Sequence, residues 1–152
     1  MFWDSILADW GHCGLFLSAF LSATLLPGSS EVLLAGLLLS GTHSEWKLLF
    51  WATLGNVLGS LLNREFGAGI LRGRGAKCLG ITPQRWSQAE GWFQQYGQWS
   101  LLLAWLPVIG DPLTIVAGTL GISRTRFVIL VTLGKAARYW ILIYAMELGS
   151  SS

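Results

Sequence analysis

The stretch Leu26-Pro27-Gly28-Ser29-Ser30-Glu31 interrupts an apolar block, 10–44, in which Glu31 is the only full charge. A second stretch, Leu106-Pro107-Val108-Ile109-Gly110-Asp111, interrupts the block 91–123, in which Asp111 is the only full charge. The proline and the acid occur in the same register in both stretches. Proline and glycine inside an apolar block end a helix. We therefore expect two breaks in the helices, marked by Pro27, Gly28, Pro107, Gly110 and Pro112.

The helices beside the first break are expected to be short. Residues 14–26 would form a helix of about 20 Å and residues 31–39 one of about 14 Å. The hydrocarbon core of a bilayer is about 30 Å thick, so neither half crosses it alone. We expect each broken block to form a re-entrant hairpin that returns to the side from which it entered. Irregular backbone is tolerated at that depth only where protein or water surrounds it.

Two further apolar blocks, 48–63 and 127–146, are unbroken and fit one membrane span each. The composition agrees, because 53% of the 152 residues are hydrophobic and 12% are charged, about half the charged share of a soluble domain. A formal net charge of +2 without a basic stripe argues against a nucleic-acid partner. Two cysteines exclude a disulfide scaffold. No spacing of His and Cys fits a metal site, so we expect neither a metal nor another cofactor.

The same order of features occurs twice in the chain. Thr53-Leu54-Gly55-Asn56 follows the first break, and Thr132-Leu133-Gly134-Lys135 follows the second. Each half contains a hairpin, a polar turn and one crossing, so the second half starts on the opposite side. The sequence predicts an all-α membrane protein of one domain, 1–152. It consists of two inverted repeats, each a re-entrant helical hairpin followed by a transmembrane helix, at about 11–66 and about 99–147.

The basic residues predict the orientation in the membrane. One side would hold seven of them and the other side Lys47 alone; the seven are Arg64, Arg72, Arg74, Lys77, Arg85, Arg124 and Arg126. Positive residues favour the cytoplasm, so we place the 64–98 loop and the 123–126 turn there and both termini outside. The linker 67–98 carries an amphipathic helix with Thr82 as N-cap. We expect this helix at the cytoplasmic interface, as an aromatic anchor or as a lateral gate or lipid sensor.

Ionisable residues inside the apolar blocks are the candidate site. A charge at such depth indicates function by default, so Glu31 and Asp111 are proton-coupling candidates. Lys135 and Arg138 share one face of the last helix, roughly 13 and 18 Å beyond Arg126, and are candidates for binding substrate. The plainer interpretation stays open: Asp111 as a helix cap, and structural ion pairs between these basic and acidic residues.

Smaller polar residues complete the candidate site. Ser29 and Ser30 stand at the start of a half-helix, where backbone N–H groups favour anions. Asn56 occupies the position in the first repeat that Lys135 occupies in the second. We expect these three residues to line the same polar interior and to contribute to binding an anionic lipid head group.

Three phrases resemble the DedA family, also called SNARE-associated or VTT-domain proteins, and the short length is similar to its YqaA subgroup. They are Leu26 to Leu34, Trp105 to Asp111, and Gly134-Lys135-Ala136-Ala137-Arg138-Tyr139. The resemblance implies facing re-entrant hairpins in a bacterial inner membrane. It also implies translocation of lipids, including polyprenyl phosphates and phospholipids, often coupled to protons. Glu31 and Asp111 match the family's membrane acids by position, and Arg138 matches an arginine. The family's arginine before the second proline is absent here.

The leading hypothesis is a proton-linked translocase for a lipid or lipid phosphate, and not an enzyme. Its partners would be membrane lipids, protons and, given the aromatic surface, a second copy in a homodimer. One alternative is a membrane phosphatase acting on a lipid pyrophosphate, because Pro27-Gly28-Ser29-Ser30 faintly resembles a motif of such enzymes. The other alternative is a non-catalytic membrane organiser. It would tolerate replacing Lys135 and Glu31 together by methionine.

Overall fold

The computed structural model describes residues 2–23, 29–41, 43–69, 82–106 and 109–150, which contain helices and no strand. The all-helical prediction is confirmed for these residues. Pro27, Gly28 and Pro107 lie outside them. In chain order the helices are α1 (Phe2–Ser22), α2 (Ser29–Leu39), α3 (Glu45–Gly69), α4 (Pro83–Tyr96), the 3₁₀ helix η1 (Gly97–Leu103), α5 (Gly110–Thr119) and α6 (Arg124–Ser150).

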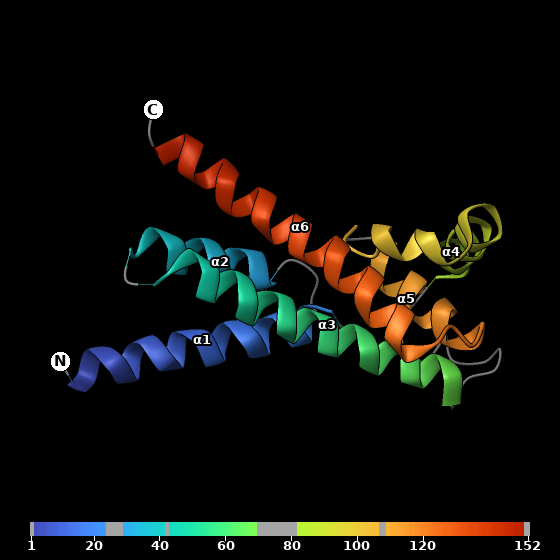
Figure 1. Cartoon of the computed structure of the whole chain (residues 1–152), viewed down its shortest axis with the longest axis horizontal. Coiled ribbons are helices and arrows are strands. Elements are labelled where there is room, and N and C mark those ends of the chain that lie inside the picture. The colour runs from blue at the N-terminus through green and yellow to red at the C-terminus, as the bar shows by residue number, and fades with distance from the viewer. Residues whose placement is uncertain (1, 24–28, 42, 70–81, 107–108, 151–152) are drawn as a thin grey trace.

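The central element is α3, and the other helices divide between its two ends (Figure 1). α1 and α2 lie at the end where α3 begins, whereas α4 and α5 lie at the end where it finishes. α6 starts beside α5, contacts α3, and finishes at the end of the molecule that holds the N-terminus. Two groups of shorter helices therefore approach the long pair α3 and α6 from opposite ends.

Glycines in α3 allow its neighbours to approach closely. A Cβ atom at Gly55 or Gly59 would collide with carbonyl oxygens of α1, and one at Gly67 would collide with a carbonyl oxygen of α5. Small residues at helix contacts are typical of membrane proteins, where close packing replaces the hydrophobic effect as the source of helix association. The glycines thus fix α1 and α5 on the two halves of α3.

The apolar core has two parts, with the candidate site between them. One cluster gathers residues of α4, η1, α5 and the start of α6, including Phe127 and Val131. The other gathers residues of α1, α2, the start of α3 and the later part of α6, including Tyr139 and Ile143. Lys135 follows the first cluster and precedes the second along α6.

The first helix is longer than expected. α1 starts at Phe2 instead of residue 14, and its 21 residues make it about 30 Å long. The sequence predicts that both helices of the first block are too short to cross the hydrocarbon core. For α1 this prediction is wrong, because its length matches the thickness of the core. The reason is that residues 2–13 contain no proline that would stop the helix earlier.

One helix of the described residues, Arg124–Gly149, is long and apolar enough to cross a membrane by length and composition. It contains the predicted span 127–146. The other predicted span lies in α3, which has 25 residues but does not meet the same criterion of apolarity. Asn56, Ser60 and Asn63 lower its hydropathy, and all three are buried inside the molecule.

The linker helix α4 begins as predicted, since the Thr82 side chain accepts a hydrogen bond from the backbone of Arg85 over 3.4 Å. Its apolar face has a different environment from the one expected. Ala89 and Phe93 are buried, and Trp86 packs against the same cluster as η1 and α5. Protein therefore covers the middle of this face, because α5 and η1 offer it an apolar surface, whereas Tyr96 stays exposed. The expected position of α4 at the membrane interface stays a prediction.

Candidate functional site

Lys135 is the most enclosed charged residue of the candidate site, with 4% of its surface exposed. Its ammonium donates hydrogen bonds to the side-chain oxygen of Asn56 and to the hydroxyl of Ser60, 2.5 Å away. Both acceptors belong to α3. A buried charge without such partners would cost several kcal/mol, so these oxygens allow the ammonium to stay inside. The two positions that the internal repeat aligns, Asn56 and Lys135, are therefore in direct contact.

Tyr139 extends this polar group to α2. Its hydroxyl contacts the Ser30 hydroxyl at 3.0 Å and accepts a hydrogen bond from the Asn56 amide at 2.8 Å. Sequence reasoning missed Tyr139, because a tyrosine in an apolar block suggests a core residue. A signal was present, since Tyr139 lies four residues after Lys135 and therefore on the same helix face. Three helices, α2, α3 and α6, thus meet through hydroxyl and amide groups.

Arg138 connects the two breaks. One nitrogen of its guanidinium forms an ion pair with the carboxylate of Glu31, in the first turn of α2. Another nitrogen donates a hydrogen bond of 2.6 Å to the carbonyl oxygen of Trp105, just before the second break. The structural ion pair that the sequence left open is therefore formed by Glu31 with Arg138. Lys135 instead contacts neutral groups, so the alternative pairing of Glu31 with Lys135 is wrong.

Asp111 is not the helix cap that the plainer interpretation expected. α5 begins one residue earlier, at Gly110, with Ile109 in the cap position and no side-chain cap. Asp111 lies in the first turn, and its charge and that of Lys135 attract one another through space. Pro112 follows inside the helix and is buried. This position suits proline because the first turn of a helix needs no N–H donor.

After the first break come two serines whose side chains lie in different surroundings. Ser30 joins the polar group around Tyr139, as predicted for a residue of the interior. The hydroxyl of Ser29 instead lies 3.4 Å from that of Ser18 on α1. Ser29 therefore contributes to the contact between α1 and α2.

The site becomes more enclosed from Glu31 toward Lys135. The side chains of Glu31 and Arg138 are 31% and 22% exposed, whereas Lys135 is buried. An ion pair that is partly open can exchange a partner, and the ammonium behind it is held by fixed acceptors. Such an arrangement can bind an anion in place of the carboxylate, because a guanidinium pairs equally well with carboxylate and phosphate.

An apolar groove of about 510 Å³ runs between α3 and α6. Its lining comes from both helices and contains no charged side chain; it consists of Trp46, Leu49, Phe50, Thr53, Leu54, Val57, Leu58, Leu61, Val128, Thr132 and Ala136. Ala136 directly follows Lys135 in the chain. The groove therefore reaches the part of α6 that carries Lys135, and its walls offer hydrocarbon an uncharged surface.

A second ionic group lies beyond the apolar block 48–63, at the end of α3. Glu65 pairs with Arg124 at 2.9 Å and with Arg64 at 2.5 Å. The hydrogen bonds from Arg124 lower the pKa of Glu65 to about 2, with a smaller contribution from Arg64. Arg64 also donates to the carbonyl oxygen of Ile122, which ties α3 to the turn before α6. These contacts fix the turn geometrically.

Comparison with known proteins agrees with the family resemblance. A family profile, the VTT domain, matches residues 26–148. "Inner membrane protein YqaA" of Escherichia coli is 46% identical over 126 residues, which cover 82% of this chain and 83% of the relative. An "Uncharacterized protein" of Haemophilus influenzae is 37% identical over 141 residues, which cover 87% of this chain and 85% of the relative. An "Alkaline phosphatase-like protein" of Lactococcus lactis is 28% identical over 85% of this chain and 66% of the relative. No solved structure matches.

Proposed function

The chain belongs to the VTT-domain family, also called DedA, and on this premise we propose that it moves a lipid or lipid phosphate across the bacterial inner membrane in a proton-linked reaction. The observation that carries the proposal is Arg138, which contacts Glu31 at one break and Trp105 before the other. A residue that holds both breaks is placed to couple a change at one to a change at the other. Polar groups of this kind near broken helices are where transporters bind their cargo.

The proposed topology places the two groups of short helices on opposite sides of the membrane. α1 with α2, and η1 with α5, would be re-entrant hairpins, while α3 and α6 cross. α1 is long enough to cross, so this topology requires its first turns to lie outside the hydrocarbon core. Support comes from the charges at the two ends of the molecule in Figure 1. The end of α3 and the start of α6 carry Arg64 and Arg124, which favours the cytoplasm. The opposite ends of the same helices carry Glu45 and Glu147.

The proposed mechanism is an exchange of partners at Arg138. A phosphate head group and the Glu31 carboxylate compete for one guanidinium, because both are anions that bind it in the same geometry. Protonation removes the charge of Glu31 and frees Arg138 for the head group. Departure of the lipid on the other side lets Glu31 lose its proton and pair again. One proton would thus accompany each head group that passes.

Lys135 and the groove complete the proposed path. Lys135 would add a second positive charge behind Arg138, held in place by Asn56 and Ser60. The charge of Asp111 would compensate Lys135 whenever no anion is bound. The lipid chain would stay in the groove between α3 and α6, so that only the head group enters the polar site. The proposal requires no metal or other cofactor and no chemical change in the lipid.

The test uses purified protein in proteoliposomes with a fluorescent polyprenyl phosphate or phospholipid and an imposed pH gradient. Wild-type protein should move the lipid faster when the gradient is present. Glu31→Gln should bind the lipid phosphate but fail to transport it, because Arg138 is then free permanently. Glu65→Gln, which removes a carboxylate beyond the span, is the matched control and should retain transport. Wild-type transport by Glu31→Gln would refute the assigned role of Glu31.

The same preparation also tests the phosphatase alternative. The Lactococcus relatives carry a phosphatase-like name at 28% identity, and Ser30 is the hydroxyl nearest to Glu31 in the chain. Under our proposal a polyprenyl pyrophosphate added to the protein stays intact. Release of inorganic phosphate that disappears in Ser30→Ala would favour catalysis instead.

A further inference from the structure

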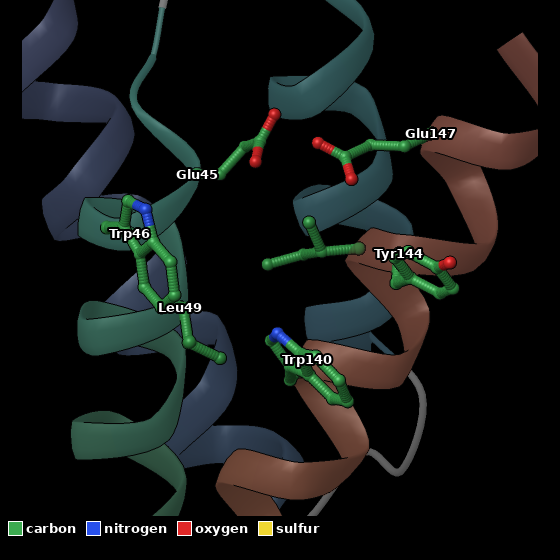
Figure 2. Close-up of a pocket in the computed structure, with 7 residues that line it drawn as sticks. Glu45, Trp46, Leu49, Trp140, Tyr144 and Glu147 are labelled. Atoms are coloured by element: carbon green, nitrogen blue, oxygen red, sulfur yellow. The ribbon is translucent and has the colours of Figure 1, made fainter. Parts of the chain in front are cut away.

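A second pocket lies at the opposite end of α3 and α6 from the Arg64 and Arg124 contacts, and the proposed transport mechanism does not use it. Its volume is about 120 Å³. Each helix contributes one acid and at least one tryptophan to its walls (Figure 2). The lining residues are Glu45, Trp46, Leu49, Trp140, Ile143, Tyr144 and Glu147.

The two acids of this pocket face one another. The carboxylates of Glu45, at the start of α3, and Glu147, near the end of α6, point toward each other across the opening (Figure 2). The pKa of Glu45 is raised, chiefly because its side chain hydrogen-bonds Glu147, while burial and the repulsion between the two charges add to the effect. Lys47, the basic residue nearest to Glu45 in the sequence, is not part of the lining. The described walls of the pocket therefore carry two acids and no basic side chain.

Aromatic rings form the sides of the pocket. Trp140 and Tyr144 stack, with their ring centroids 6.0 Å apart and their planes inclined by 14°, and Trp46 stands on the other helix (Figure 2). The faces of such rings attract cations, and ammonium groups above all. An aromatic belt at the membrane surface would account for the rings alone. It does not account for two carboxylates placed between them.

The pocket continues into the apolar groove. Trp46 and Leu49 line both cavities, so a molecule with its head in the pocket can extend its chain along α3 and α6. Thr53, which lines the groove one turn beyond Leu49, is 8% exposed, and its hydroxyl has no hydrogen-bond partner in the described part of the chain. A lipid ester carbonyl at this depth would supply the missing acceptor.

We propose that the pocket binds the ammonium head group of a membrane lipid, between the two carboxylates and the three aromatic rings, with a lipid chain in the groove. The ammonium offsets the repulsion between Glu45 and Glu147. The apolar walls of the groove distinguish a lipid from a small free amine. Glu147 lies about 13 Å along α6 from Arg138, so the ammonium head group leaves the anion site at Arg138 open. Its chain shares the groove with the chain of the transported lipid.

The test is lipid binding to the full-length protein, followed by native mass spectrometry in detergent. Phosphatidylethanolamine and phosphatidylglycerol with identical chains are titrated in parallel. Wild-type protein should retain the ethanolamine lipid in preference. In the double variant Glu45→Gln with Glu147→Gln, the ratio of ethanolamine lipid to glycerol lipid retained should fall by roughly tenfold. The reason is that the charged hydrogen bonds to the ammonium and its ion pairing are lost. Glu90→Gln, an exposed acid on α4, is the matched control and should retain it.

Further measurements separate the parts of the proposal. Trp140→Ala should also weaken the binding of phosphatidylethanolamine, while the binding of phosphatidylglycerol stays unchanged. Tetramethylammonium chloride should displace the lipid only at millimolar concentration, because it lacks the chain. Equal retention of both lipids by wild-type protein, or unchanged preference in a folded double variant, would overturn the proposal. Complete displacement by micromolar tetramethylammonium would show a site for free amines and overturn the role of the groove.

Discussion

The two breaks carry the same proline and acid in register, yet the helices that follow them are packed very differently. In α5 all residues from Pro112 to Gly118 are buried, whereas in α2 the buried residues are Ser30 and Leu34. The acids differ in the same way. Glu31 reaches a guanidinium in a partly open position, while Asp111 is held in a packed helix and attracts Lys135 at a distance. The comparison shows that α5 is packed more closely inside the molecule than α2.

Arg138 is the residue whose loss should disturb both breaks at once. Arg138→Gln removes the ion pair with Glu31 and leaves that carboxylate without its cation. We expect loss of transport and a decrease of about 1–2 kcal/mol in the free energy of unfolding, because breaking a partly exposed ion pair costs more than a surface pair and less than a buried one. Transport and thermal unfolding in detergent measure the two effects. Arg138→Lys keeps the charge and should recover most of the stability, and an Arg138→Gln variant with wild-type transport would contradict the coupling.

Matched apolar truncations in α5 and α2 compare the packing of the two hairpins directly. Leu113 in α5 is 0% exposed and Val32 in α2 is 77% exposed. Leu113→Ala should cost about 2–5 kcal/mol through the cavity that it leaves, and Val32→Ala less than about 0.5 kcal/mol. Chemical denaturation in detergent gives both numbers. Similar costs at the two positions would show that α2 is as firmly packed as α5.

Tyr139 tests the contact that holds α2 to α6. Tyr139→Phe removes the hydroxyl that meets Ser30 and Asn56 and should cost about 1 kcal/mol. Because Ser30 lies beside Glu31, the same change should loosen α2 and increase hydrogen exchange there more than in α5. Tyr144→Phe, on the exposed side of α6, is the control. An equal increase of hydrogen exchange in α2 and α5 would show that Tyr139 does not hold α2 in particular.

Glu65 gives the smallest expected effect and a dependence on pH. Its ordinary pKa of 4.5 falls to about 2 in the folded protein, so its ion pairs stabilise the fold above pH 4.5. This contribution is lost as the pH falls from 4.5 toward 2. The difference in melting temperature between wild type and Glu65→Gln should be at most about 2 °C at pH 6. It should shrink toward pH 2.5 and in high salt, and a difference that grows on acidification would contradict the assignment.

The sequence was sufficient to predict the all-helical class and the inward charges, since both follow from local patterns. It did not predict the start of α1, which lies at Phe2 instead of residue 14. Thr82 predicts the start of α4, and the spacing of Lys135 and Arg138 predicts their common face. The partners of those charges could not be predicted, because Glu31 and Arg138 are brought together by tertiary packing. The same limit explains α4: its apolar face indicates burial but does not distinguish lipid from the surface of α5.

The proposed arrangement of two hairpins entering from opposite sides is tested most directly by labelling single cysteines in intact membranes. Ser40 lies at the end of α2 and Ser123 directly before α6, and each would be replaced by cysteine in a chain without Cys13 and Cys78. A membrane-impermeant maleimide should label Ser40→Cys in whole cells and Ser123→Cys only in inside-out vesicles. Labelling of both from the same side would contradict the inverted arrangement and the path through Arg138 that depends on it.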